Sequence, residues 1–200
     1  MDIITKSQFD KFCRQYGFEH INESSAFELF IIYCVMSKYM KSETITKDLL
    51  NEVNIGSGGD WGIDGYVFII NGKVVTTCQE VDDLIAANNS LSVQFVFIQA
   101  KTSESFSTAE LGQTLDGVED ILNDVLGKTN LAPANDDIIN LRQLVKHIYT
   151  KSADFREGIN PQITVYYATC GNYQEQQDYI SKISKTEEFI SQTDLVSSFE

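Results

Sequence analysis

The apolar positions near the start of the chain recur with the period of an α-helix. Phe9, Phe12 and Tyr16 are spaced as one helical stripe, which predicts a short amphipathic helix over residues 7–16. A longer helix is expected over residues 22–41, where the middle of the segment is apolar on nearly every side. Such a helix cannot expose one face to water without cost, so we expect it to be largely buried.

The next apolar segments are short and rich in β-branched and aromatic residues. Strands are predicted over residues 66–70 and 74–77, joined by Asn71-Gly72, a dipeptide suited to the two left-handed positions of a type I′ turn. Residues 93–101, VQFVFIQAK, are apolar on both faces, which is typical of a central strand covered on each side.

Further elements complete an α/β pattern. A short third helix is expected over residues 46–53, and a glycine-rich loop follows it. Residues 80–89 are expected to form a short helix or a turn insertion. A helix is expected over residues 107–126, where Ser107 and Glu110 are spaced as a capping box. Two more helices are expected over residues 136–155 and 173–184, with a strand between them over residues 162–169. We therefore expect an α/β fold in which a mixed central sheet is flanked by helices.

Length and composition favour one folded domain. The chain has 200 residues, of which 42% are apolar, and its 15 basic and 29 acidic residues give a net charge of −14. The longest apolar run, Leu29–Met36, is too short to cross a bilayer, and the N-terminus lacks the pattern of a signal peptide. We expect a cytoplasmic protein that does not bind membranes.

The chemistry of a site must depend on carboxylates and lysine. The four cysteines are scattered without a CxxC spacing, and the two histidines, His20 and His147, are not spaced as a ligand pair, which argues against a zinc site or a catalytic triad. We expect reduced thiols and histidines without a catalytic role.

Four polar residues interrupt or end apolar segments where burial would exclude them. Asp64 follows the glycine-rich loop at the mouth of a strand, Gln99 and Lys101 end the central strand on one face, and Glu28 interrupts the apolar helix. Oxygen ligands at strand ends suit Mg²⁺ or Mn²⁺, and a lysine beside them suits phosphodiester hydrolysis. A structural ion pair of Lys101 with Asp64 or Glu28 explains the same residues equally well.

The stretches GGDWGIDGYVFIING and VQFVFIQAKTSESFS resemble the Asp…Gln-x-Lys signature of the PD-(D/E)XK nuclease superfamily, and in detail the N-terminal domain of abortive phage infection (AIPR) proteins. The resemblance implies a restriction-endonuclease-like αβββαβ core. It also implies that Asp64, Glu28, Gln99 and the main-chain carbonyl of Ala100 bind the metal, and that Lys101 serves the attacking water. Its implied activity is a Mg²⁺-dependent endonuclease in anti-phage defence, acting on DNA more than on RNA.

Two features depart from that pattern. Gln99 stands where the pattern has a second acidic ligand, so the site would hold a metal ion less tightly unless Glu28 or Asp60 supplies the missing negative charge. For Asp60, a turn role is the simpler expectation. The net charge of −14 opposes binding to a phosphate backbone. A basic stripe could offset it, made of Lys101, Lys128, Arg142, Lys146 and Lys151, although a solvated face is the simpler interpretation of the helical members.

Two alternatives therefore stay open at this stage. Trp61 is either an exposed contact for a substrate base or the packed anchor of its loop. The chain is either the nuclease, as the N-terminal part of a longer protein that supplies basic surface, or a catalytically weak relative. In the second case it would serve as a protein-binding or assembly module, for example as a homodimer.

Overall fold

The computed structural model describes residues 1–56, 58–171, 173 and 176–200, and it has an α/β fold. A mixed five-stranded sheet has the strand order β2-β1-β3-β4-β5. The strands are β1 (Gly65–Ile70), β2 (Lys73–Val75), β3 (Val93–Lys101), β4 (Gln162–Thr169) and β5 (Ser198–Phe199). β1 is antiparallel to β2 and β3, whereas β3, β4 and β5 are parallel.

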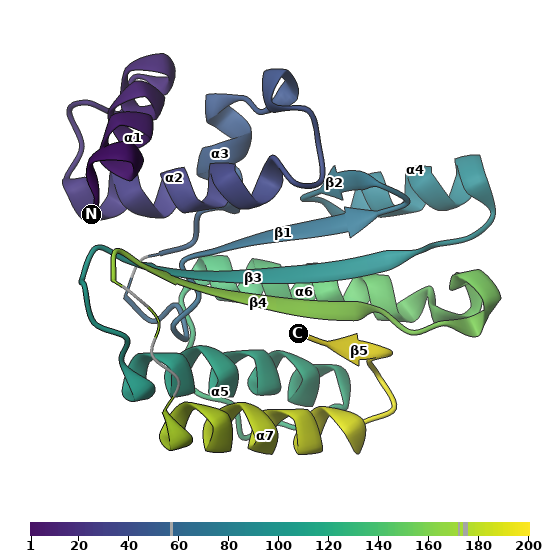
Figure 1. Ribbon diagram of the computed structural model, residues 1–200. Coiled ribbons are helices and arrows are strands. Elements are labelled where there is room, and N and C mark those ends of the chain that lie inside the picture. Colours follow the sequence, from purple (N-terminus) through teal and green to yellow (C-terminus); the bar gives the residue numbers. More distant parts are fainter. Residues whose placement is uncertain (57, 172, 174–175) are drawn as a thin grey trace.

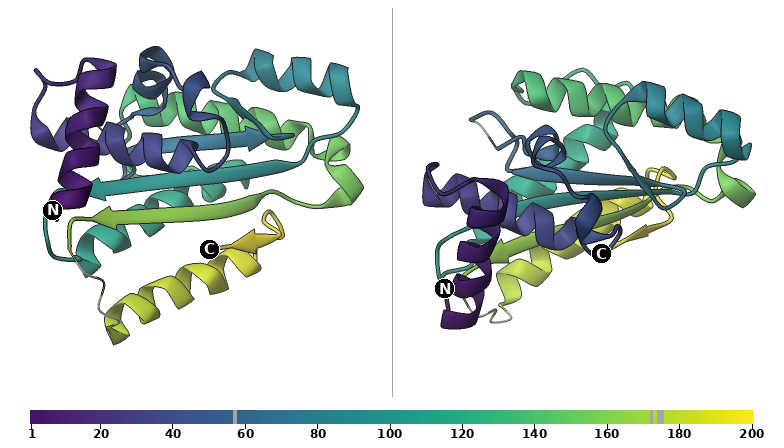
Figure 2. Two further views of the ribbon diagram at one scale, coloured as in Figure 1. Left: turned by 45° about the horizontal axis from the view of Figure 1, so that its top comes forward. Right: turned by 90° about the horizontal axis from the view of Figure 1, so that it is seen from above.

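Helices cover both faces of this sheet, as Figures 1 and 2 show. α1 (Ile3–Tyr16) and α2 (Glu23–Met36) lie on one side, and α3 (Lys47–Val53) packs against α2 and β1. α5 (Thr108–Val125), α6 (Asp136–Thr150) and α7 (Gln177–Ser191) lie on the other side, while α4 (Cys78–Asn88) follows the hairpin and contacts α6. Three short 3-10 helices occupy connections, at Ser42–Thr44, Ser152–Asp154 and Arg156–Gly158.

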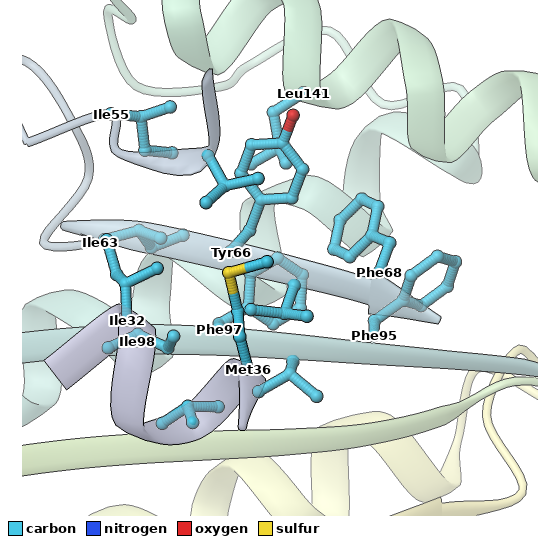
Figure 3. Packing of buried hydrophobic residues seen from close by; sticks show 14 of the residues in the cluster. Ile32, Met36, Ile55, Ile63, Tyr66, Phe68, Phe95, Phe97, Ile98 and Leu141 are labelled. Carbon is cyan, nitrogen blue, oxygen red and sulfur yellow. The ribbon is translucent and has the colours of Figure 1, made fainter. Parts of the chain in front are cut away.

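The core is built on β1 and β3, which are apolar on both faces as their composition predicts. Ile32 and Met36 of α2 pack against one face of this strand pair (Figure 3). On the other face Phe68 lies 4.7 Å from Phe95 and 5.6 Å from Phe97, measured between ring centroids. Steeply tilted rings of this kind add specific contacts to the burial of apolar area.

Most predicted elements are present, and the differences lie at their ends. Asn71 and Gly72 have φ angles of 51° and 77°, which confirms the left-handed turn of the hairpin. α2 ends at Met36 rather than near Lys41, and α6 ends at Thr150 rather than at 155. The predicted start of the last helix includes residues 174 and 175, and the glycine-rich loop includes residue 57; these lie outside the described residues.

Two local predictions need correction. Ser107 accepts a hydrogen bond from the Glu110 N–H, but the Glu110 carboxylate accepts one from the Tyr167 hydroxyl instead of completing a capping box. The last helix extends to Ser191, beyond the predicted residue 184, because Thr186 and Ile190 continue its buried stripe. Within the described part of the chain, no helix combines the length and the apolarity that a membrane span requires.

Candidate functional site

The predicted site residues come from the end of β3, the approach to β1 and the middle of α2. Asp64 precedes Gly65, which pairs with Ile98, so Asp64 stands beside Gln99 at the end of the antiparallel ladder. The sheet thus brings two segments 35 positions apart into contact. Figure 1 shows α2 passing over the same end of β1 and β3.

Asp64 is a buried carboxylate held by the backbone of β3. Its side chain accepts a hydrogen bond of 2.7 Å from the Ala100 N–H, and its own N–H donates to the Ile98 carbonyl. The residue is only 3% exposed. Burial raises the pKa of Asp64, while the Ala100 N–H and the Lys101 ammonium oppose that rise.

Lys101 is the cation of the site. Its Nζ lies 3.6 Å from Oδ2 of Asp64, and its side chain is 31% exposed, against 5% for Asp64. This distance makes an ion pair with Asp64, which is one of the two alternatives that the sequence leaves open for Lys101. Because the lysine keeps part of its surface in solvent, its ammonium can also donate a hydrogen bond to a ligand that reaches this end of the sheet.

Glu28 approaches the same space from α2. A Cβ placed on Gly56 would lie 2.9 Å from Oε2 of Glu28 and 3.4 Å from Oδ1 of Asp64, so both carboxylates face the one small gap that this glycine leaves open. Burial and the neighbouring Asp64 raise the pKa of Glu28 to about 7, and Lys101 offsets only part of this rise. The site therefore carries more negative charge than Lys101 neutralises.

The glycine-rich loop is fixed by its own side chains. Asp60 accepts a hydrogen bond of 2.8 Å from the Gly62 N–H, which is the turn role expected from its glycine neighbours. Trp61 is 6% exposed, and its Nε1–H donates to the Pro133 carbonyl at 2.9 Å. Trp61 thus occupies the anchoring position, and the alternative of an exposed ring stacked on a substrate base is wrong for this structure.

Gln99 turns toward α5. It is 1% exposed, and its Oε1 lies 3.4 Å from the hydroxyl of Thr114, which also donates to the Gly62 carbonyl at 2.7 Å. Alternation along β3 puts Gln99 on the face opposite α2, so Gln99 and Glu28 reach the end of the sheet from opposite sides. As a metal ligand, Gln99 stays a prediction.

The oxygen atoms near Asp64 suit a hard divalent cation. The N–H and C=O of a strand residue point to the same side, so the Ala100 carbonyl is directed like its N–H, toward Asp64. Across the described residues, no three His, Cys, Asp or Glu side chains are grouped to hold a metal ion. A cation bound by Asp64 and Glu28 would therefore need the Ala100 carbonyl, an amide or water as further ligands.

The basic stripe considered from the sequence is neutralised where it lies on α6. Arg142 and Lys146 each approach Asp124 of α5 to 2.8 Å, and Lys151 lies 2.7 Å from Asp82 of α4. These cations stabilise contacts between helices. They do not form a free surface for phosphate groups.

Sequence reasoning missed the residues that shape the site without charge. Thr114 and Gly56 belong to segments whose relation to Asp64 depends on tertiary packing. A threonine within a predicted helix and one glycine among several carry no distinguishing signal. Comparisons with family models, with curated proteins and with solved structures found no match to this chain.

Proposed function

We propose that this chain is a metal-dependent nuclease domain that hydrolyses phosphodiester bonds, with a restriction-endonuclease-like core and a role in anti-phage defence. The observation that supports the proposal is the convergence of Glu28, Asp64 and Lys101 at one end of the sheet. The two carboxylates are not fully neutralised and could bind a cation, and the partly exposed ammonium group next to them could contact a phosphate. The sequence resemblance supports the same activity.

In this proposal Asp64 and Glu28 hold Mg²⁺ or Mn²⁺ together with the Ala100 carbonyl. When bound, the ion supplies Lewis-acid polarisation of a phosphate oxygen. Lys101 would donate hydrogen bonds to the attacking water or to the phosphate, where negative charge increases during the reaction. Its contact with Asp64 keeps that ammonium in place before substrate arrives.

A cleft lies near these residues, although Glu28, Asp64 and Lys101 are not among its described lining residues. It has a volume of about 740 Å³. Two of its lining residues are Phe27, which precedes Glu28 in the sequence, and Thr169, which pairs with Lys101 in the sheet. Asp2 and Glu104 also line it, so the cleft has no excess of positive charge in the described part of the chain. We therefore expect weak binding of DNA without a divalent cation.

The paired cations of α6 favour a second candidate, a nuclease-like fold that binds a protein partner without cleaving nucleic acid. Arg142 and Lys146 form ion pairs with Asp124, and the net charge of −14 favours binding of a basic partner over binding of a polyanion. The two candidates differ in whether any divalent-cation-dependent cleavage exists.

Cleavage of supercoiled plasmid DNA and of a folded RNA, with Mg²⁺, Mn²⁺ or EDTA, tests the proposal. We expect the wild type to cleave only with a divalent cation, and Lys101→Ala to lower the rate at least about 100-fold. Lys73→Ala is the matched control and should cleave normally, because Lys73 is an exposed lysine at the start of β2, paired with Ile70 at the far end of β1. A folded wild type without activity, or a rate that Lys101→Ala leaves unchanged, contradicts the proposal.

A further inference from the structure

A second cavity lies on the other face of the sheet, away from Glu28. It is lined by residues of α5, α7, β4 and β5 and has a volume of about 360 Å³, within the range of small-ligand sites. Five of its lining residues are aromatic: Phe106, Tyr167, Tyr173, Tyr179 and Phe199. The first four are joined by ring contacts. None of these side chains has a part in the proposed hydrolysis.

The four rings are arranged as walls. The ring centroid of Phe106 lies 5.6 Å from that of Tyr167 and 5.4 Å from that of Tyr173, with interplanar angles of 55° and 78°. The ring centroid of Tyr179 lies 6.5 Å from that of Phe106 and 6.2 Å from that of Tyr173. Rings that meet at steep angles can present several faces to one enclosed group.

Hydrogen bonds hold two of these rings before any ligand arrives. The Tyr167 hydroxyl donates to Oε2 of Glu110 at 2.9 Å, and the Tyr179 hydroxyl donates to the Phe106 carbonyl at 2.9 Å. Burial raises the pKa of Tyr167 to about 12, and the adjacent Glu110 adds to that rise. The Tyr167 phenol therefore stays neutral and fixed, and its donation to a carboxylate makes the ring more electron-rich.

The charge around the cavity selects one kind of ligand. Glu200 lines it, and no Lys, Arg or His is among the described lining residues. Aromatic faces attract cations and do not attract anions, and a nearby carboxylate increases that preference. A phosphate-bearing ligand would be repelled, whereas an alkylated ammonium group would contact the rings and leave its charge near Glu200.

We propose that this cavity is an aromatic cage for an alkylammonium group, such as a trimethylammonium head. The walls are Phe106, Tyr167, Tyr173 and Tyr179, and Glu200 supplies the negative charge. The group would belong either to a free small molecule or to a methylated lysine side chain. The inference is independent of the nuclease proposal, because it uses none of the residues on the Asp64 side.

Titration of the chain with choline and with its neutral isostere 3,3-dimethylbutan-1-ol, followed by NMR or calorimetry, tests the cage. We expect choline to bind at least about tenfold tighter than the isostere, since only the charge differs. A peptide with trimethyllysine forms a second arm. Tighter binding of the peptide than of choline identifies a protein side chain as the ligand, and the reverse order identifies a small molecule; either order supports the cage.

Variants locate the binding on the proposed walls. Tyr173 is 58% exposed, so Tyr173→Ala should fold and should weaken choline binding about tenfold. Ile180→Ala, on α7 but outside the cavity lining, is the control and should bind choline normally. Equal binding of choline and the isostere, no binding of choline at millimolar concentration, or normal choline binding by Tyr173→Ala overturns the inference.

Discussion

Glu28 has an environment that differs from that of an ordinary surface carboxylate. It lies in an apolar helix, faces Asp64 across the gap at Gly56 and has a pKa of about 7 instead of 4.5. The raised pKa means that the surroundings disfavour the ionised form of Glu28, and a positive charge placed nearby would stabilise that form. Either a proton or a cation can supply positive charge at this carboxylate, and the two must therefore compete.

The stability of the protein should depend on this group. The folded state holds the Glu28 proton more tightly than the unfolded chain, so its contribution is fully present below pH 4.5 and is lost as pH rises through about 7. Glu28→Gln should therefore be more stable than the wild type at pH 8, by about 2 kcal/mol after allowance for partial solvent exposure, and nearly equal to it at pH 4. Urea unfolding at both pH values measures this difference.

A matched variant makes that test specific. Glu52→Gln removes an exposed carboxylate on α3 and should show no gain at pH 8. If Glu28→Gln is as stable as or less stable than the wild type at pH 8 in the absence of divalent cations, the electrostatic account of Glu28 is wrong.

Most of the charged residues of the site could be predicted, because each breaks an apolar pattern. Glu28, Asp64 and Lys101 stand out for that reason, and the structure brings them together. The environment of Trp61 could not be predicted, since its hydrogen-bond partner Pro133 lies 72 positions away. The contact between Gln99 and Thr114 likewise depends on how α5 packs against the sheet.

At the scale of elements, the packing of α2 on β1 and β3 determines where Glu28 lies. The helix lies close to the sheet at Gly65, where an added Cβ would collide with Cδ1 of Ile32. Ile32 is one helical turn beyond Glu28, so the absence of a side chain at Gly65 sets the distance between the helix and the site. The glycine that follows Asp64 is therefore part of the geometry of the site.

Gly65→Ala should push α2 away from the sheet. We expect a loss of about 2 kcal/mol in the free energy of unfolding, because the added methyl group would overlap a fully buried side chain. Gly58→Ala is the control, since a Cβ there would meet nothing within 4 Å. Chemical denaturation of both variants measures the difference, and a Gly65→Ala variant as stable as Gly58→Ala would contradict the proposed contact.

The sequence pattern predicted the long strands with their bounds, and it missed the shortest strand. The strand over residues 93–101 and the strand over 162–169 have the predicted bounds because each contains several β-branched or aromatic residues in a row. β5 has two residues, which is too few to show a period, and its pairing with β4 depends on the return of the chain after α7. Helix ends shifted where a buried stripe continued or stopped.

At the scale of the whole molecule, negative charge is the dominant electrostatic feature. The chain has a net charge of −14, and the cations on and directly after α6 are already paired with Asp124 and Asp82. Self-repulsion destabilises a compact state, and salt screens it. The paired cations lose some attraction in salt, but those partly exposed pairs contribute little to stability.

The free energy of unfolding should therefore rise when salt is added. Raising NaCl from 20 to 200 mM shortens the Debye length about threefold. We expect this change to increase the free energy of unfolding at pH 8 by an amount on the order of 1 kcal/mol. Thermal unfolding followed by circular dichroism measures it. A decrease in stability would show that the ion pairs between helices contribute more than the net repulsion costs.

Binding of Mn²⁺, followed by electron paramagnetic resonance, measures the proposed cation site at Asp64 and Glu28 without requiring cleavage. The account predicts one saturable site in the wild type, and at least about tenfold weaker binding by Asp64→Asn and by Glu28→Gln, while Glu52→Gln binds like the wild type. Equal Mn²⁺ affinity of the wild type, Asp64→Asn and Glu28→Gln would contradict it.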